Sequence, residues 1–209
     1  MTVTVSGREV PSDWQERWRR FHVPVLVGSR LYVRPPWDEA PLWPGVIDLV
    51  IDPGRAFGTG AHPTTRLSLE LLLEIEPDGS FGDLGCGSGV LAIAAAKLGF
   101  GPVRALDADV DAVEATRRNA AANGVALDRV ERADLRNRRA PAARTVAANL
   151  TRPLLLRLAE SIEEPPNSLI VSGLLEAEAD ELARSFTARG LREQRRLAER
   201  GWVALLLGR

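Results

Sequence analysis

A glycine-rich loop with two acidic residues near it carries the clearest chemistry in the sequence. The run DLGCGSG places Asp83 ahead of Gly85, Gly87 and Gly89, and a second acid, Asp107, follows 22 residues after Gly85. In an open α/β sheet, ligands bind at the carboxyl ends of the strands, where glycines allow close approach and an acid accepts hydrogen bonds from both ribose hydroxyls. The pattern therefore predicts a site for a nucleoside-containing cofactor.

The spacing of the glycines leaves the identity of that cofactor open. Read from Gly87, the residues GSGVLA fit the G-x-G-x-x-G/A pattern of dinucleotide-binding loops, so NAD is one interpretation. Asp83 favours S-adenosylmethionine (AdoMet), because the methionine end of AdoMet carries an ammonium and a sulfonium and no phosphate. The same carboxylate would repel a pyrophosphate. A glycine turn that binds no ligand is the third interpretation.

Two further motifs narrow the choice. DPGRAFGTGAHPTT, residues 52–65, precedes the glycine loop, and VAANL, residues 146–150, ends a later predicted strand. Together with the loop and Asp107, these segments resemble the bacterial PrmA family, methyltransferases that modify large-subunit ribosomal protein eleven. The resemblance also takes in the Trp-rich segment 13–37 and so covers most of the chain. It implies AdoMet as cofactor and methyl transfer to lysine or terminal amines of a protein, such as a ribosomal protein.

The resemblance also implies roles for individual residues. Asn149 is expected at the methyl-transfer site, as the catalytic residue and as a contact to the cofactor, and Thr65 is expected to contact the methionine portion. Asp134, in ERADL after a predicted strand, stands where many AdoMet enzymes contact the adenine. The predicted cofactor-binding set is Thr65, Asp83, Gly85, Gly87, Gly89, Asp107, Asp134 and Asn149, and no metal site is predicted.

Each of these residues also has a purely structural interpretation. Thr64 or Thr65 is equally suited to capping a helix, and Asn149 to closing a strand through its own turn hydrogen bond. His62 is either a base or, in a glycine-rich loop, a residue that bonds the backbone. Cys86 fits a small residue filling a tight turn.

Two other functional classes are less consistent with the motifs. An NAD-type oxidoreductase would leave segments 52–65 and 146–150 unexplained, and no acid for hydride transfer is evident. A non-catalytic AdoMet-binding module would tolerate loss of Asn149 or of the glycine loop, yet both are intact.

The elements that must position these residues read as alternating strands and helices. This alternation predicts a doubly wound, Rossmann-like α/β sheet of seven strands, the fold of AdoMet-dependent methyltransferases, with the last two strands antiparallel across Arg200-Gly201. The predicted sheet strands are 80–84, 103–107, 129–133, 145–150, 168–172, 192–198 and 202–207. The predicted helices are 63–74, 90–98, 109–123, 153–163 and 175–189, and segments 25–35 and 46–52 are read as extended.

The chain is divided into a short N-terminal extension, residues 1–45, and an AdoMet-dependent methyltransferase domain, residues 46–209. The extension contains a Trp-rich helix, with a capping-box pattern at 12–15 and Trp14, Trp18 and Phe21 on one face, and then a strand. PrmA proteins carry a further N-terminal domain that grips the ribosomal substrate. Because about 45 residues are too few for an independent domain, we expect the catalytic part alone, which leaves the acceptor open.

Composition and charge exclude several other classes. The chain has 209 residues, 45% of them hydrophobic, enough for one core. The longest apolar run, residues 90–96, is too short to span a membrane, no signal-peptide core is present, and a single cysteine suits a reducing compartment, so a cytoplasmic protein is expected. A net charge of −1, with acids interleaved among the arginines, does not favour nucleic-acid binding.

Overall fold

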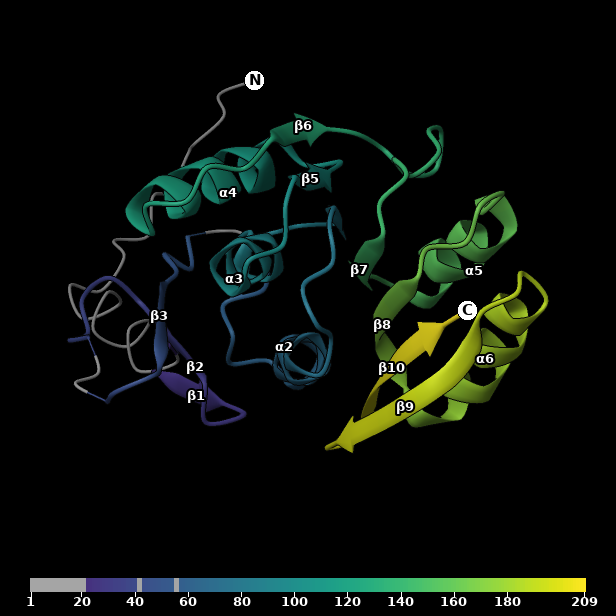
Figure 1. Cartoon of the computed structure of the whole chain (residues 1–209), viewed down its shortest axis with the longest axis horizontal. Coiled ribbons are helices and arrows are strands. Elements are labelled where there is room, and N and C mark those ends of the chain that lie inside the picture. Colours follow the sequence, from purple (N-terminus) through teal and green to yellow (C-terminus); the bar gives the residue numbers. More distant parts are fainter. Residues whose placement is uncertain (1–21, 41–42, 55–56) are drawn as a thin grey trace, which may run out of the picture.

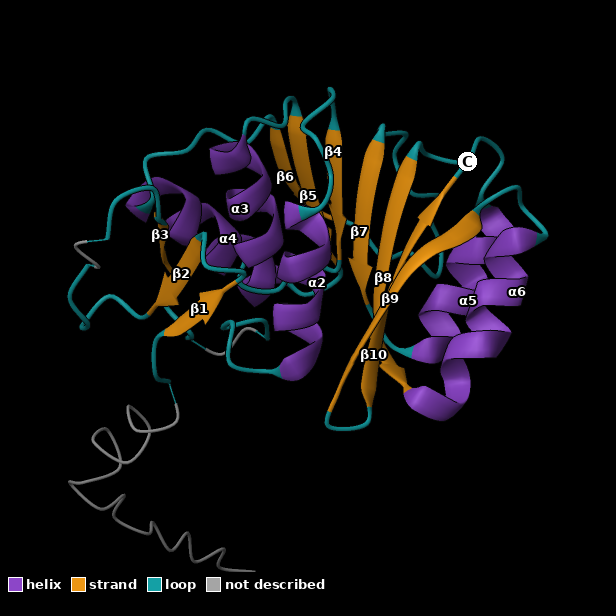
Figure 2. Ribbon diagram, turned by 60° about the horizontal axis from the view of Figure 1, so that its bottom comes forward, coloured by secondary structure: helices purple, strands orange, loops and turns teal. Residues whose placement is uncertain are grey.

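The seven strands predicted for the large sheet form one sheet in the computed structural model, which describes residues 22–40, 43–54 and 57–209 (Figures 1 and 2). The strand order is β6-β5-β4-β7-β8-β10-β9. The strands are β4 (Phe81–Leu84), β5 (Val103–Asp107), β6 (Arg129–Arg132), β7 (Thr145–Asn149), β8 (Ser168–Leu175), β9 (Arg192–Glu199) and β10 (Trp202–Gly208). The predicted doubly wound sheet is confirmed.

The order in which strands are added to the sheet reverses at β4. This strand pairs in parallel with both β5 and β7. The chain runs outward from β4 to β6 on one side and then continues through β7 and β8 on the other. Ligands of open α/β sheets bind at the carboxyl ends of strands next to such a switch point. At the other edge, β10 is antiparallel to β8 and β9, and the β9–β10 hairpin turns at Arg200 and Gly201, as predicted.

Helices cover both faces of this sheet (Figure 2). One face carries α2 (Pro63–Leu73), α3 (Val90–Leu98) and α4 (Val110–Ala122), and the other carries α5 (Arg152–Ser161) and α6 (Ala179–Thr187). The bounds of α3 agree with the prediction. The helix predicted over 175–189 is wrong at its start, because β8 continues to Leu175 and a short 3₁₀ turn, Glu176–Glu178, precedes α6.

The core lies in two layers, one on each side of the large sheet. Along β10, Ala204 and Leu206 belong to the cluster beneath α2 and α3, whereas Val203 and Leu205 belong to the cluster beneath α5 and α6. This alternation is the period-2 pattern of a strand buried on both faces. It explains why the terminal strand reads as a continuous apolar run.

A smaller, three-stranded sheet packs against the outer side of α2 and α3 (Figure 2). Its strands are β1 (Val25–Val27), β2 (Leu31–Arg34) and β3 (Ile47–Val50). The single extended stretch predicted over 25–35 is therefore a hairpin, which reverses where Gly28 and Ser29 adopt φ of 53° and 56°. β2 and β3 lie on either side of residue 45, the predicted domain boundary, and pair in parallel with each other. The division into two parts at residue 45 stays a prediction. The predicted Trp-rich helix lies outside the described residues.

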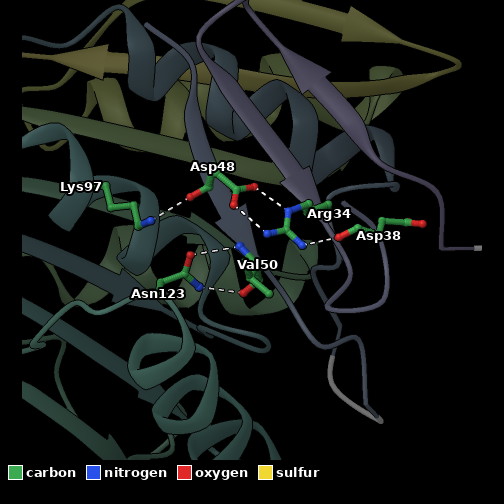
Figure 3. A network of polar contacts seen from close by, with 6 residues as sticks. All are labelled: Arg34, Asp38, Asp48, Val50, Lys97 and Asn123. Atoms are coloured by element: carbon green, nitrogen blue, oxygen red, sulfur yellow. Dashed lines mark hydrogen bonds and ion pairs between the residues drawn. The ribbon is translucent and has the colours of Figure 1, made fainter. Parts of the chain in front are cut away.

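Polar contacts fasten β3 to β2 and to the helices α3 and α4 (Figure 3). Asp48 accepts two hydrogen bonds of 2.8 Å from the Arg34 guanidinium, and its backbone carbonyl accepts one of 2.8 Å from Lys97 of α3. Asn123, at the end of α4, accepts from the Val50 N–H at 3.0 Å and donates to the Val50 carbonyl at 2.6 Å. The end of β3 is thus held beside the start of the 52–65 motif.

Over the described ranges, every helix is too short or too polar to cross a membrane.

Candidate active site

The glycine loop lies between β4 and α3 and is held by the neighbouring strand. The N–H groups of Gly85 and Cys86 both donate to the carbonyl of Leu106, at 2.8 and 2.9 Å. A Cβ on Gly85 would lie 2.3 Å from the side chain of Leu150, and one on Gly87 would lie 2.4 Å from the carbonyl oxygen of Phe57. The fold itself therefore requires these glycines, and their presence alone does not indicate a ligand.

Residues 57–62, which we call the strap, lie across this loop. The carbonyl of Phe57 accepts from the Ser88 N–H at 2.8 Å, and the carbonyl of Gly58 accepts from the Ser88 hydroxyl at 2.6 Å. The strap leads directly into α2, whose first residues carry the predicted Thr65. Two motifs that are separate in the sequence, 52–65 and the glycine loop, thus form one structural unit.

Asn119 of α4 ties this unit together and was missed by the sequence analysis. Its buried carboxamide accepts from the Asp52 N–H at 3.0 Å and donates to the carbonyl of Ser88 at 2.9 Å. Asn123, one helical turn later, holds β3 as described above. The signal available in the sequence was two asparagines at i, i+4 spacing on one face of a helix.

A cleft of about 480 Å³ opens at the carboxyl ends of β4 and β5, and Gly85, Asp107 and Asp134 line it. Asp107, the last residue of β5, accepts from the N–H of Gly87 at 2.9 Å through one oxygen and from the N–H of Asp109 at 3.0 Å through the other. A carboxylate has about four lone-pair sites, so two acceptor positions of Asp107 stay open. The other residues that line the cleft are Ala108, Ala133, Leu135, Arg136, Leu150, Thr151, Pro153, Leu154 and Arg157.

Asp134 lies at the rim of this cleft and is held by Arg136. The carboxylate accepts from the backbone N–H of Arg136 at 2.9 Å and from its Nε at 3.0 Å. These hydrogen bonds, and then the charge of the guanidinium, hold the pKa of Asp134 below its ordinary value. The cleft therefore presents two carboxylates that are fixed in position by backbone N–H groups.

Asn149, the last residue of β7, contacts Thr64, the neighbour of the predicted cofactor residue Thr65. Its Nδ2 donates to the Thr64 hydroxyl at 3.3 Å, and that hydroxyl lies 2.8 Å from Nδ1 of His62. His62 is the N-cap of α2, because its Nδ1 accepts from the Thr64 N–H at 3.3 Å. Capping by Thr64 or Thr65 is thus wrong, and the interpretation of His62 as a backbone-bonding residue is confirmed.

Aromatic rings enclose His62. Its imidazole makes edge contacts with Phe57 and Trp202, with ring centroids 5.2 and 5.0 Å apart. Burial, and then the positive charge of Arg66, lowers the pKa of His62. The lowered pKa favours the neutral ring, which suits its role as a hydrogen-bond acceptor at Nδ1.

Thr65 and Asp83 are buried and carry open hydrogen-bonding capacity. Across the part of the chain that the structure describes, the only buried side-chain oxygen or nitrogen atoms without a partner are Thr65 Oγ1 and Asp83 Oδ1. The other Asp83 oxygen accepts from the Ala92 N–H at 3.0 Å. Burial raises the pKa of Asp83 to about 7. Native proteins leave few such atoms unsatisfied, and both of these lie beneath the surface, where neither water nor a ligand reaches them in this structure.

The lone cysteine has a structural environment. Cys86 is buried, and its Sγ accepts from the Thr116 hydroxyl at 3.2 Å. Burial raises the pKa of the thiol well above its ordinary value, which disfavours the reactive thiolate. This agrees with the interpretation of Cys86 as a small residue within a tight turn.

The predicted site residues fall into two groups in the structure. Gly85, Asp107 and Asp134 line one cleft, and Asn149 joins the beginning of α2. Five predicted residues do not line that cleft: Thr65, Asp83, Gly87, Gly89 and Asn149 itself. The ligand contacts assigned to all of them stay predictions.

Comparison with known proteins identifies a family and several relatives that this chain resembles over most of its length. The family model described as ribosomal protein L11 methyltransferase (PrmA) matches residues 2–209. A ribosomal protein L11 methyltransferase of Chromohalobacter salexigens is 38% identical over 197 residues, covering 92% of this chain and 66% of the relative. One of Pelobacter propionicus is 42% identical over 211 residues, covering 94% and 67%. The chain thus spans about two thirds of the length of these curated relatives.

A solved structure shows the same fold. The crystal structure of a ribosomal protein L11 methylase from Lactobacillus delbrueckii subsp. bulgaricus superposes with a TM-score of 0.82 at 26% identity, covering 90% of this chain and 99% of that one. More distant neighbours include a Pyrococcus abyssi tRNA (uracil-54, C5)-methyltransferase, with a TM-score of 0.57 at 23% identity. At that identity the likeness concerns the fold alone.

Proposed function

The chain belongs to the ribosomal protein L11 methyltransferase (PrmA) family, and from this membership we propose that it transfers methyl groups from AdoMet to amino groups of ribosomal protein L11. The observation that carries the proposal is the family match over residues 2–209, which includes the strap, the glycine loop and the strand that ends in Asn149. As the acceptor is a ribosomal protein, the enzyme works in the cytoplasm.

The residues present fit AdoMet. Asp107 offers two open acceptor positions in the cleft for the ribose hydroxyls, and Asp134 is an ionised acceptor for the adenine amino group. When bound, AdoMet supplies a methyl group on a positively charged sulfur.

The chain's own task in such a reaction is to present a neutral, aligned amine. A lysine amine with a pKa near 10.4 is almost fully protonated at neutral pH and then has no lone pair for attack. Enclosure by apolar groups favours the neutral amine, and a carbonyl oxygen that accepts one of its N–H groups orients the lone pair. Asn149 Oδ1 is the group we assign to this task.

The two other functional classes are less well supported. An NAD enzyme would place a pyrophosphate beside a loop that follows the buried acid Asp83. A non-catalytic module would have no need for the hydrogen bonds that join Asn149 to the beginning of α2.

The direct test is transfer of a labelled methyl group. Wild-type chain is incubated with methyl-labelled AdoMet and ribosomal protein L11, and the labelled residues are mapped by mass spectrometry. We expect label on lysine or N-terminal amines of L11. Asp107→Ala should reduce labelling at low AdoMet, whereas Asp111→Asn, which changes an exposed acid in the first turn of α4, serves as the matched control.

Two outcomes would overturn the proposal. If the chain binds S-adenosylhomocysteine but labels neither L11 nor another protein of a ribosomal extract, it is a binding module. If calorimetry shows NAD binding and no response to AdoMet, the assignment of AdoMet as the cofactor is wrong.

A further inference from the structure

Asn149, Thr64 and His62 form a continuous chain of hydrogen bonds at the carboxyl end of β7. The distances are 3.3 Å from Asn149 Nδ2 to Thr64 Oγ1 and 2.8 Å from Thr64 Oγ1 to His62 Nδ1. Thr64 is only 1% exposed, so its hydroxyl hydrogen-bonds to protein groups rather than to solvent water. The residues come from two segments 85 positions apart in the sequence.

The direction of each hydrogen bond follows from one fixed donor. The backbone N–H of Thr64 can only donate, and it points at His62 Nδ1, at 3.3 Å. Nδ1 therefore carries a lone pair, and the proton of the neutral ring is on Nε2. The Thr64 hydroxyl has a single proton, which it gives to Nδ1, so toward Asn149 it can only accept.

This direction decides how the Asn149 carboxamide lies. Its NH₂ group must face Thr64, since an oxygen placed there would meet a hydroxyl oxygen with no proton left to share. Oδ1 is then turned away from Thr64. On that side Gly173 has no side chain, and a Cβ there would stand 3.2 Å from Asn149 Oδ1.

We propose that His62 and Thr64 are positioning residues, which hold the Asn149 carboxamide with its oxygen free to accept an N–H from the acceptor amine. The part that concerns the amine rests on the proposed function. The part that concerns the hydrogen-bond directions rests on the geometry alone. His62 thus acts through Thr64 and is not the base of the reaction.

Protonation of His62 should reverse the direction of the hydrogen bonds that join His62, Thr64 and Asn149. A proton on Nδ1 makes that atom a donor, the Thr64 hydroxyl then accepts from it, and its own proton turns toward Asn149. The carboxamide is favoured in the flipped orientation, which presents NH₂ to the amine.

The groups that face His62 oppose this protonation. They are the rings of Phe57 and Trp202 and the cation Arg66, which is paired with Glu199 of β9. Burial and Arg66 lower the pKa of the ring. The neutral form, and with it the productive orientation of Asn149, is therefore favoured at neutral pH.

The first test needs no activity and uses nuclear magnetic resonance on the ¹⁵N-labelled full chain bound to S-adenosylhomocysteine. The chain has two histidines, so His62→Asn assigns the imidazole signals of His62. We expect the Nε2–H tautomer for His62, and faster exchange of the Asn149 side-chain amide protons in Thr64→Val. An Nδ1–H tautomer, or unchanged amide exchange in Thr64→Val, would overturn the proposal whether or not the chain methylates L11.

The second test is kinetic and uses L11 as acceptor. Thr64→Val should lower kcat at least about tenfold, the equivalent of one lost hydrogen bond, while S-adenosylhomocysteine affinity changes about twofold or less. Thr64→Ser keeps the hydroxyl and should recover most of the rate. Thr145→Val, a buried threonine at the opposite end of β7, is the matched control for the loss of a hydroxyl from this region.

A pH profile separates positioning from a structural role. Asparagine at position 62 keeps an acceptor atom and a good helix cap but cannot be protonated, so the kcat of His62→Asn should not carry the titration of the imidazole. The ratio of wild-type to His62→Asn kcat should fall as pH drops through the pKa of His62. The ratio cancels the titration of the acceptor amine, which both enzymes share. A ratio independent of pH, or full activity in Thr64→Val, would contradict the proposal.

Discussion

The two ends of the candidate active site are built in different ways. In the cleft, Asp107 and Asp134 stand at or just after the ends of their strands and are held by backbone N–H groups no more than 20 residues away. Around Asn149, the contacts join segments 85 residues apart, and Trp202 from the last strand closes on His62. The first end follows from the local form of an α/β sheet, whereas the second exists only once the whole sheet has formed.

Their hydrogen-bonding states differ as well. The cleft retains open acceptor positions on Asp107, as a binding site requires. In the Asn149–Thr64–His62 chain, hydrogen bonds join the three side chains to one another. Substitutions in the cleft should therefore change cofactor affinity, and substitutions around Asn149 should change turnover.

The largest effect is expected for Asn149→Ala. Loss of the group that orients the acceptor should lower kcat roughly a hundredfold, the scale of a misplaced reacting group. The fold should be preserved, because Asn149 is half-buried at a strand end and contributes little packing. Methyl transfer to L11 and thermal unfolding, measured together, check this, and normal turnover or an unfolded variant would refute it.

Asp107→Ala should act on binding instead. Removal of hydrogen bonds to a charged group should weaken S-adenosylhomocysteine binding by roughly 1.5–3 kcal/mol, or about 10- to 100-fold in Kd. At saturating AdoMet, kcat should change much less. If Asp107→Ala binds as tightly as the Asp111→Asn control, the cleft does not hold the ribose.

Asp83→Asn should change how stability depends on pH. Because the pKa of Asp83 is raised from 3.8 to about 7, the folded chain binds more protons than the unfolded chain between these values. The free energy of unfolding should therefore decrease as pH rises from about 4 to about 7 and level off above that range. Urea unfolding at several pH values should show this decrease in wild type, relative to Asp83→Asn, and parallel curves would contradict it.

The smallest effect is expected for Asp134→Ala. Asp134 is at the rim of the cleft and its carboxylate is shared with Arg136, so only a modest contact to the adenine is lost. S-adenosylhomocysteine affinity should fall about two- to fivefold, as for one exposed hydrogen bond. A loss as large as that of Asp107→Ala would place the main binding contacts at the adenine.

The same contrast explains what the sequence could predict. Strand ends follow from apolar runs and helix caps, so β5 with its terminal Asp107, and α3 with its stop at Gly99, are predictable from local patterns. The pairing of Thr64 with Asn149 is not, because Thr64 and Thr65 are adjacent threonines and only the docking of α2 on β7 decides which one meets the strand.

Other differences have equally specific causes. The β1–β2 hairpin turns at Gly28-Ser29, a dipeptide that is itself a hairpin signal and that the reading of 25–35 as one extended stretch overlooked. Asn119 was missed because its partners, Asp52 and Ser88, lie in segments 67 and 31 residues away. The contacts of Asn119 depend on tertiary structure that no local pattern records.

Calorimetric titration of S-adenosylhomocysteine into Asn149→Ala and Asp107→Ala, side by side with wild type, tests the division into a binding end and a transfer end most directly. We predict that Asp107→Ala loses about 10- to 100-fold in affinity. Asn149→Ala should lose severalfold at most, since any contact it makes to the methionine end is one among several. Equal losses in the two variants would contradict the account, because Asn149 would then hold the cofactor rather than the acceptor.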